Sequence, residues 1–267
     1  MNDAKPVILK IGGSAITDKT AEATPRTEII NRLAEEIKLA DIDNLIIVHG
    51  GGSFGHPTAA KYGIKDGYKG DPTQKLGFAE THHMMTVLNG LVMDALIWHE
   101  IPAVSIAPSS CIITENGKVK YFDETVLKSM AKMLFTPVMY GDAVFDEKLG
   151  FTVISGDQLV AYLAIKYQAQ KIVIGADTDG LFDADPKTNP NAKPYKHLTL
   201  AELKQIQPKL GKSSGADVTG GMAGKIAELI PAIEQGVHVT ITGATKSLSI
   251  YRALTDQSVL GTEIEKA

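Results

Sequence analysis

Short runs of apolar, mostly β-branched residues recur along this 267-residue chain, at 7–11, 45–48, 103–106, 137–140, 171–174 and 237–241. Continuous apolar runs of this length are typical of strands buried on both faces of a parallel sheet. The intervening segments have apolar residues three or four positions apart, as at Leu33 and Ile37 or at Leu88 and Val92, which indicates helices. Alternating strands and helices predict an α/β fold with a mostly parallel central sheet and helices on both of its faces.

Two stretches interrupt this alternation and predict β-hairpin insertions. Residues 111–121 alternate in polarity around Asn116-Gly117, and residues 144–154 turn around Gly150. The segment 63–77, rich in Gly, Lys and Asp, is expected to be a mobile surface loop or lid. Because no repeat or Pro/Ser-rich linker divides the chain, we expect a single domain over residues 1–267 whose halves form two lobes.

Composition excludes several classes of protein. Hydrophobic residues make up 44% and charged residues 22%, as in folded soluble proteins. Lys plus Arg is 27 and Asp plus Glu is 31, so a net charge of −4 favours neither nucleic acid nor an anionic membrane as partner. A single cysteine, Cys111, fits a reducing compartment. Because no membrane span or signal peptide is evident, we expect a cytoplasmic protein.

Two glycine-rich turns directly follow predicted strands. Gly12-Gly13-Ser14 comes after the first strand, and His49-Gly50-Gly51-Gly52 ends the second. Glycines let backbone N–H groups approach an anion, and a helix that starts beyond the turn adds the positive end of its dipole. Both turns lie at the carboxyl ends of sheet strands, where open α/β folds bind ligands. They predict a phosphate site, with simple tight turns as the alternative.

Two common phosphate motifs do not account for these turns. Neither Gly211-Lys212-Ser213 nor Gly224-Lys225 has a glycine at the first position of a P-loop, which excludes that motif. Gly50, Gly52 and Gly55 match G-x-G-x-x-G, but the glycine-rich segment 63–77 follows where a strand ending in an acidic residue is required. A dinucleotide-dependent oxidoreductase is therefore a weak alternative.

Three later segments also follow or precede predicted elements. Asp157 opens an apolar-periodic helix, either as a residue favoured by the helix dipole or as an anchor for lysines. The strand 171–174 leads into the loop 175–187, and residues 217–225 precede another helix.

His49 either braces the glycine turn or touches a ligand. His82-His83 is interpreted as a surface or lid pair, and Cys111 as an inert small apolar residue.

Taken together, these segments resemble the ordered motif set of the amino acid kinase superfamily. The motifs are Lys10-Ile11-Gly12-Gly13-Ser14, His49-Gly50-Gly51-Gly52, Gly141-Asp142, Gly156-Asp157, Asp177-Thr178-Asp179-Gly180 and Thr219-Gly220-Gly221-Met222-Ala223-Gly224-Lys225, and they span nearly the whole chain. Within that superfamily, four further segments resemble the isopentenyl phosphate kinases. They are Ile16-Thr17-Asp18-Lys19, Gly52-Ser53-Phe54-Gly55-His56-Pro57, Pro102-Ala103-Val104-Ser105 with Pro108-Ser109-Ser110, and Ile154-Ser155-Gly156-Asp157.

The resemblance implies the amino acid kinase fold, which is an open αβα sandwich with a mostly parallel central sheet, and also a homodimer and a specific phosphotransfer. The γ-phosphoryl group of ATP would pass to isopentenyl phosphate, giving isopentenyl diphosphate in an alternative mevalonate pathway. Mg²⁺ would be bound through the ATP phosphates, with no dedicated metal site. The N-terminal lobe, about 1–155, would bind the acceptor, and the C-terminal lobe, about 156–267, would bind ATP. Alternatives are a kinase for another phosphate or phosphonate such as fosfomycin, or a non-catalytic nucleotide-binding sensor or storage module.

Carried over by matching motif, the resemblance also implies site residues. The catalytic residues would be Lys10, Lys19, His56, Asp157 and Lys225. ATP would be bound by Lys10, Gly12, Gly13, Ser14, Gly52, Asp177, Phe182, Asp183, Lys187, Gly221 and Lys225. The acceptor phosphate would be bound by Gly51, His56 and Gly156. Asp157 is assigned to orient Lys10 and Lys19 through charge-assisted hydrogen bonds.

These residue types suit phosphoryl transfer between two phosphates. The enzyme must align two anions and neutralise the moving group, for which lysines and backbone N–H groups suffice. The second pKa of a phosphate monoester is about 6, so the attacking oxygen is largely ionised at pH 7 and needs no general base.

A C5 tail requires an apolar pocket. The candidate lining residues are Phe78, Met84, Met139, Val144 and Ile154. Each of them is also compatible with an ordinary place in the hydrophobic core, which is the more common one for such residues.

Overall fold

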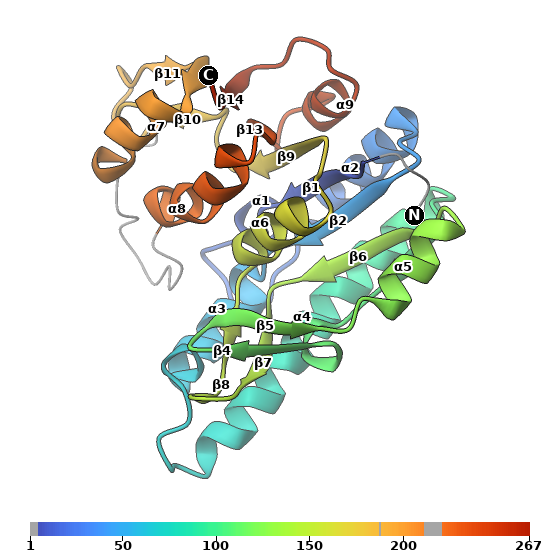
Figure 1. Cartoon of the computed structure of the whole chain (residues 1–267), viewed down its shortest axis with the longest axis vertical. Coiled ribbons are helices and arrows are strands. Elements are labelled where there is room, and N and C mark those ends of the chain that lie inside the picture. Colours follow the sequence, from blue (N-terminus) through green and yellow to red (C-terminus); the bar gives the residue numbers. More distant parts are fainter. Residues whose placement is uncertain (1–4, 187, 211–220) are drawn as a thin grey trace.

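The six apolar runs form six strands of one large sheet, which also contains two strands, β12 and β14, that the sequence did not predict. The computed structural model describes residues 5–186, 188–210 and 221–267, and within them the sheet has eight strands in the order β12-β14-β13-β9-β1-β2-β6-β3 (Figure 1). The strands are β1 Val7–Ile11, β2 Leu45–His49, β3 Ala103–Ser105, β6 Thr136–Tyr140, β9 Lys171–Ala176, β12 His197–Thr199, β13 His238–Gly243 and β14 Gly261–Glu265. Only the β13–β14 pairing is antiparallel, which confirms the predicted mostly parallel sheet.

Strand β1 lies at the centre of this sheet, between β2 and β9. In its register Ile8 pairs with Ile46 and Ile172, and Leu9 pairs with Ile47 on β2. Successive side chains of a strand point to opposite faces of the sheet, so Ile8 and Leu9 are buried in two different hydrophobic cores. Ile8 belongs to one buried cluster and Leu9 to another, both at 0% exposure. The continuous apolar runs therefore reflect burial on both faces.

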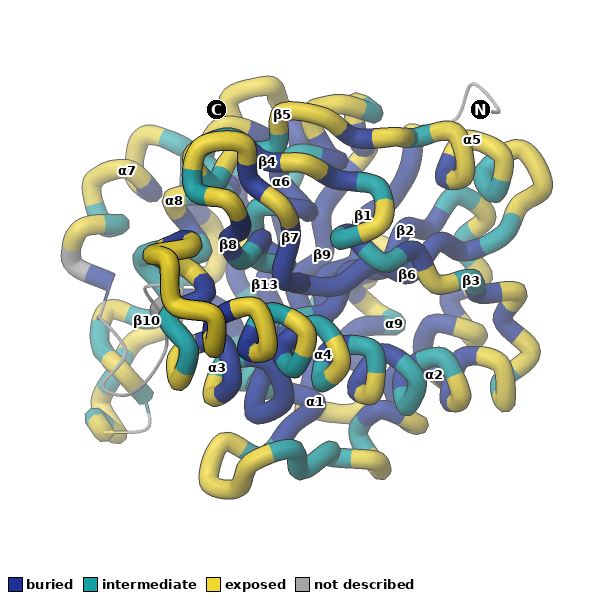
Figure 2. Tube along the Cα trace, turned by 90° about the horizontal axis from the view of Figure 1, so that it is seen from below, coloured by how far each residue is buried: buried dark blue, intermediate teal, exposed yellow. Residues whose placement is uncertain are grey.

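Helices cover both faces of the sheet. Helices α6 (Gly156–Lys166) and α8 (Gly221–Glu234) pack on the Ile8 face, and α2 (Thr27–Ala40), α4 (Thr73–Trp98) and α9 (Ser249–Leu254) pack on the Leu9 face. The strands are buried while the outer sides of the helices are exposed (Figure 2). The remaining helices are α1 Gly13–Ile16, α3 Gly52–Lys61, α5 Thr125–Lys132 and α7 Leu200–Ile206, with 3-10 turns η1 Ile64–Asp66, η2 Pro108–Ser110 and η3 Gln207–Lys209. This arrangement confirms the predicted αβα sandwich.

Both predicted hairpins form, and they join in a second, smaller sheet. Its order is β5-β4-β7-β8 among the described residues, with β4 Ile112–Glu115, β5 Lys118–Phe122, β7 Asp142–Asp146 and β8 Gly150–Ile154. Asn116 and Gly117 have φ values of 50° and 75°, the left-handed pair that a tight two-residue hairpin turn requires. A short antiparallel pair, β10 Leu181–Phe182 and β11 Pro194–Tyr195, follows β9.

Asp146 fastens the turns of the two hairpins to each other. Its carboxylate accepts the Gly117 N–H and the Thr114 hydroxyl, both at 2.8 Å, and the Leu149 N–H at 2.8 Å. Burial alone raises the pKa of this carboxyl, but the hydrogen bonds outweigh it and lower the pKa to about 2. The small sheet is therefore held as one unit beneath the large one.

The segment 63–77 departs from the sequence prediction. Residues from Thr73 onward belong to α4, and Ile64 is fully buried in the 3-10 turn η1, so the expectation of a loop over the whole segment was wrong. The buried Gln74 amide donates to Tyr62 O and Gly67 O, both at 3.1 Å. These contacts involve residues seven to twelve positions away, which local composition does not reveal. In the part of the chain that the structure describes, no helix is both long and apolar enough to cross a membrane.

Candidate active site

The loops after four strands meet at one edge of the large sheet. The Gly12 N–H donates to Gly175 O at 2.8 Å, which joins the turn after β1 to the carboxyl end of β9. The Gly50 N–H donates to Ile11 O at 2.9 Å, and the Gly141 N–H donates to His49 O at 3.0 Å. The turn after β1 therefore lies between the turns after β2 and β9, at the carboxyl ends where the sequence predicted a ligand site.

The two glycine turns touch each other directly. A Cβ atom on Gly13 would lie 2.2 Å from Gly52 N, a distance that no side chain tolerates. Gly52 has a φ of +49°, and a Cβ there would lie 2.0 Å from Thr17 Oγ1. Glycine at these two positions is thus required for the turns to pack, whatever they bind.

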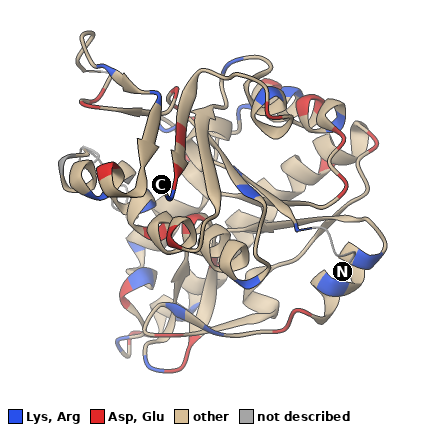
Figure 3. Cartoon of the chain, turned by 45° about the horizontal axis from the view of Figure 1, so that its top comes forward, with Lys and Arg blue, Asp and Glu red and all other residues tan. Residues whose placement is uncertain are grey.

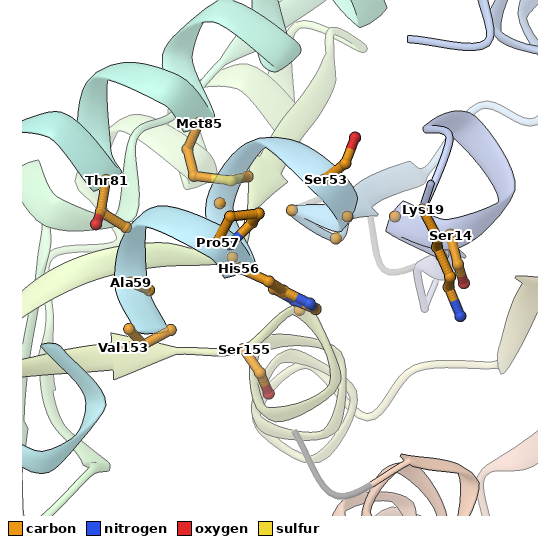
Figure 4. A pocket seen from close by; sticks show the side chains of 18 of the residues that line it. Ser14, Lys19, Ser53, His56, Pro57, Ala59, Thr81, Met85, Val153 and Ser155 are labelled. Carbon is orange, nitrogen blue, oxygen red and sulfur yellow. The ribbon is translucent and has the colours of Figure 1, made fainter. Parts of the chain in front are cut away.

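A cavity of about 450 Å³ opens beside the paired turns (Figure 4). Its walls bring together most of the site residues that the sequence predicted. These are Lys10, Gly12, Gly13, Ser14, Lys19, Gly51, Gly52, His56, Gly156, Asp157 and Lys225. They come from positions 10 to 225 of the chain, so the fold assembles them from segments far apart in sequence.

The starts of two helices contribute to the same cavity. Gly52 opens α3, and Gly156 opens α6, which is capped by a reciprocal pair of hydrogen bonds between Ser155 and Gln158. N–H groups of a first helical turn have no partner within the helix, and the helix dipole adds partial positive charge there. His56 lies one turn into α3 and reaches toward the start of α6, while Lys19 approaches from the loop after α1 (Figure 4).

Charge at this site is local rather than spread over the molecule. Basic and acidic residues are interspersed over the helices and loops in the view of Figure 3. Within the cavity, lysines from three different segments line the wall, at positions 10, 19 and 225. Carboxylates also line the cavity, at positions 22, 142 and 157, so the lysines offer local contacts to a phosphate-bearing ligand rather than a strong overall positive charge.

Lys10 and Asp157 form a buried ion pair at the centre of the cavity wall. Lys10 Nζ lies 2.5 Å from Asp157 Oδ1, and the residues are 3% and 5% exposed. The expected orientation of Lys10 by Asp157 is therefore present. Lys19 differs from the expectation: its Nζ lies 3.4 Å from Asp177 Oδ2 rather than beside Asp157. The reason is geometric, because the loop carrying Lys19 approaches from the side of the loop after β9.

Of the remaining predicted nucleotide residues, those that the structure describes are not among the residues lining this cavity. Asp177 directly follows β9, and Phe182 ends β10. Asp183 Oδ1 accepts the Lys193 N–H at 2.7 Å, which closes the loop between β10 and β11. Gly221 begins α8, whereas Lys187 and the motif residues 219 and 220 lie outside the described residues. The described members of this set follow β9 or lie in β10, the loop after it and α8.

The end of the cavity away from Lys19 is largely apolar (Figure 4). It is lined by Pro57, Ala59, Met85 and Val153, with Thr81 beside them. Of the five residues proposed from sequence, only Ile154 lies among the lining residues; Phe78, Met84, Met139 and Val144 do not. Met85 was missed because it looks like ordinary helix core, and only the fold brings its sulfur against Gly51 and Gly55.

Three other residues considered from sequence have structural surroundings. His49 is fully buried and contacts Asn89 and Gly50 O, and burial lowers its pKa, so it braces the turn as a neutral ring. His82 is only partly exposed, because its ring contacts the buried carboxylate of Asp142 at 3.0 Å, so the surface or lid interpretation was incomplete. Burial raises the pKa of Cys111 to about 11, which fits an inert thiol.

Comparison with known proteins agrees with this geometry. The profile of the amino acid kinase family matches residues 5–243. The chain is 39% identical to the isopentenyl phosphate kinase of Methanothermobacter thermautotrophicus over 266 residues, covering 97% of this chain and 98% of that protein. An X-ray structure of isopentenyl phosphate kinase superposes with a TM-score of 0.85 at 36% identity, covering 97% of this chain and 99% of that one. An isopentenyl phosphate kinase substrate complex superposes with a TM-score of 0.80 at 28% identity, covering 98% and 100%.

Proposed function

This chain belongs to the amino acid kinase family and, within it, to the isopentenyl phosphate kinases, and from that premise we propose its reaction. It transfers the γ-phosphoryl group of ATP to isopentenyl phosphate, giving isopentenyl diphosphate and ADP for isoprenoid synthesis by an alternative mevalonate pathway. One observation carries the proposal: a single cavity joins a cradle of glycine turns and lysines to an apolar end lined by Met85 and Val153 (Figure 4). A small phosphate monoester with a hydrocarbon tail needs a polar region that binds its phosphate and an apolar region that binds its tail.

The residues of the cavity suit an in-line transfer. An oxygen of the acceptor phosphate attacks the γ-phosphorus while the bond to the bridging oxygen of ADP breaks, so charge develops on the moving group. We propose that Lys10, Lys19 and Lys225 stabilise that charge. We propose that His56, Gly51 and Gly156 bind the acceptor phosphate. The acceptor oxygen is already ionised near pH 7, so no side chain has to remove a proton.

Asp157 acts through Lys10 rather than on the substrate. The pair is buried and only 2.5 Å apart, so the ammonium group is held in one place before ATP arrives. A charged group that is already oriented stabilises a transition state without a reorganisation cost. We therefore keep Asp157 as the residue that orients Lys10, and we assign Asp177 to Lys19.

The nucleotide is proposed to lie on the C-terminal side of the cavity. Gly12, Gly13, Ser14 and Gly52 would contact its phosphates, and the lobe of about 156–267 would hold the rest. The residues assigned to that lobe are Asp177, Phe182, Asp183, Lys187, Gly221 and Lys225. Asp177 and α8 lie beside the cavity, which supports this placement for the described members.

Magnesium is proposed to enter with ATP. Across residues 5–186, 188–210 and 221–267, no three His, Cys, Asp or Glu side chains are arranged to hold a metal ion. Mg²⁺ keeps several waters and is commonly held through substrate phosphates, so this residue set fits an ion carried by the nucleotide. When bound, the ion would neutralise part of the phosphate charge.

A homodimer in the cytoplasm is the proposed state of the protein. Support for association comes from α4, where Val87, Ile97 and Trp98 are 40%, 58% and 81% exposed. Contiguous exposed apolar side chains are typical of a contact surface, and Ile97 and Trp98 are adjacent at the end of α4. Sedimentation of the wild type and of Trp98→Glu checks this: a dimer weakened by the substitution is expected, and a monomeric wild type would contradict it.

The function is tested by ADP release with Mg-ATP and a panel of acceptors. Isopentenyl phosphate, dimethylallyl phosphate, fosfomycin, UMP and N-acetylglutamate are compared at equal concentration. We expect the highest kcat/KM with isopentenyl phosphate. A preference for fosfomycin would instead support a phosphonate kinase, and ATP binding without turnover on any acceptor would support a sensor or storage role.

A further inference from the structure

Thr17 lies between the two glycine turns and is fully buried. Its hydroxyl donates to Gly13 O at 2.8 Å and accepts the Ser53 N–H at 3.0 Å. Gly13 belongs to the turn assigned to ATP, and Ser53 lies in the first turn of α3, the helix that carries His56. One hydroxyl group therefore bridges the nucleotide side and the acceptor side of the cavity.

Ser53 of α3 also contacts the other end of the loop that follows Thr17. The Ala23 N–H donates to Ser53 O at 3.0 Å, and the Thr24 N–H donates to Ser53 Oγ at 3.4 Å. Residues 18–24 therefore form a loop with both ends attached to Ser53. Movement of this loop relative to α3 requires at least one of these hydrogen bonds to break.

The start of α3 depends on this attachment. Its N-cap residue, Gly51, has no side chain and cannot cap the helix. Thr17 supplies an acceptor for the Ser53 N–H, one of the first-turn donors that has no partner within a helix. The Thr17 hydroxyl also lies where a side chain on Gly52 would have to be, so the contact between the turns is close as well as hydrogen-bonded.

The loop attached in this way carries Lys19. That side chain is 56% exposed and its ammonium group lies 3.4 Å from Asp177, a contact too exposed and too long to hold the loop by itself. The position of the loop backbone therefore determines where the Lys19 side chain is attached relative to α3. Because His56 lies on α3, the distance between these two residues is determined by the attachment at Ser53.

We propose that Thr17 is a positioning residue for the transfer: its hydroxyl holds Lys19 in register with the acceptor helix and sets the gap between the two phosphates. This inference rests on the proposed function and adds to it a residue that contacts neither substrate. Phosphoryl transfer depends on holding two anions in line, and a misplacement of roughly 1 Å costs on the order of 100-fold in rate.

The test compares Thr17→Val, which keeps the shape and removes the hydroxyl, with Thr17→Ser, which keeps the hydroxyl. We expect Thr17→Val to lower kcat by roughly 10- to 100-fold, with KM for ATP and isopentenyl phosphate changed by less than about threefold. Thr17→Ser is expected to restore most of the kcat. A KM effect without a kcat effect, or no rescue by serine, would overturn the proposal.

Thr262→Val is the matched control for lost stability. Thr262 is also fully buried, accepts the Leu181 N–H at 2.8 Å and donates to Tyr195 O at 2.5 Å, and it does not line the cavity. Thr262→Val is expected to unfold at a lower temperature than the wild type, as Thr17→Val is, and to keep the wild-type kcat at saturating ATP. An equal loss of kcat in both variants would show that Thr17 acts only through stability.

Two further measurements keep the outcomes separate. If Thr17→Val does not fold, Ser53→Ala removes only the attachment to Thr24, and it is expected to lower kcat in the same direction by a smaller factor. An unchanged kcat in that variant would overturn the proposal. Wild-type activity on isopentenyl phosphate is measured first, because its absence would contradict the proposed function rather than the role of Thr17.

Discussion

Replacing Asp157 by asparagine should weaken both the fold and the reaction, because it removes the negative charge that is paired with the buried Lys10. Lys10 is 3% exposed, and its ammonium group lies 2.5 Å from the carboxylate. Breaking a buried ion pair by removing one partner costs about 3–5 kcal/mol, and we expect the lower end because asparagine keeps an oxygen that accepts a hydrogen bond. A change of about 3 kcal/mol corresponds to a Tm lower by roughly 6–12 °C for a chain of this size.

The assay is thermal unfolding without nucleotide, combined with steady-state kinetics. We expect kcat to fall by roughly 100-fold, since Lys10 would no longer be held in place for the γ-phosphate. A double variant, Lys10→Met with Asp157→Leu, should regain much of the stability, because apolar pairs often replace buried ion pairs without loss. It should not regain activity, which separates the two roles of the pair.

Asp256→Asn is the matched control. Lys171 is also buried and lies 2.5 Å from Asp256, but that carboxylate is 74% exposed, and Lys171 also donates to Ala253 O and Leu254 O at 3.0 and 2.8 Å. The cost there should stay below about 1 kcal/mol. If Asp157→Asn proved no more destabilising than Asp256→Asn, the reasoning about the buried pair would be refuted.

Three further predictions follow from the site and its surroundings. His56→Ala should lower kcat/KM for isopentenyl phosphate by roughly 10- to 100-fold while KM for ATP stays unchanged; an effect on ATP alone would contradict the assignment. Gly52→Ala should prevent stable folding or abolish activity, because its Cβ would lie 2.0 Å from Thr17 Oγ1, and a fully active, stable variant would show that the turns are not rigid. The hydrogen bond to Asp142 raises the pKa of His82, so its stabilising effect is full below the unfolded pKa of about 6.5 and is lost as pH rises through the folded pKa. The destabilisation caused by His82→Gln, under about 1 kcal/mol for this partly exposed pair, should therefore be larger at low pH than at high pH in urea unfolding.

Much of the architecture was predictable because it depends on local patterns. Apolar runs predicted six of the eight strands of the large sheet, but not the short or polar strands β12 and β14. The Asn116-Gly117 turn predicted the first hairpin through its need for two positive φ angles. The glycine turns at 12–14 and 50–52 were predictable as an anion site because they follow strands. The segment 63–77 was misjudged, since the contacts of Gln74 that order it come from residues whose spacing carries no pattern.

The details of the site were less predictable, because they join residues far apart in the chain. Lys10 meets Asp157 across 147 positions and Lys19 meets Asp177 across 158, and only the first pairing had been assigned. Thr17 has no sequence signal for its contact with Ser53, since threonines are common in loops. Met85 has the spacing of a core residue of α4, and its place in the cavity arises from the glycines it packs against.

The most direct measurement is a competition between two acceptors in one reaction. Isopentenyl phosphate and fosfomycin are mixed at equal concentration with limiting Mg-ATP, and the products are followed by ³¹P NMR. A cavity that joins a phosphate cradle to an apolar end predicts that isopentenyl diphosphate forms first, in step with ADP. Phosphorylation of fosfomycin ahead of isopentenyl phosphate, or ADP release without either product, would contradict it.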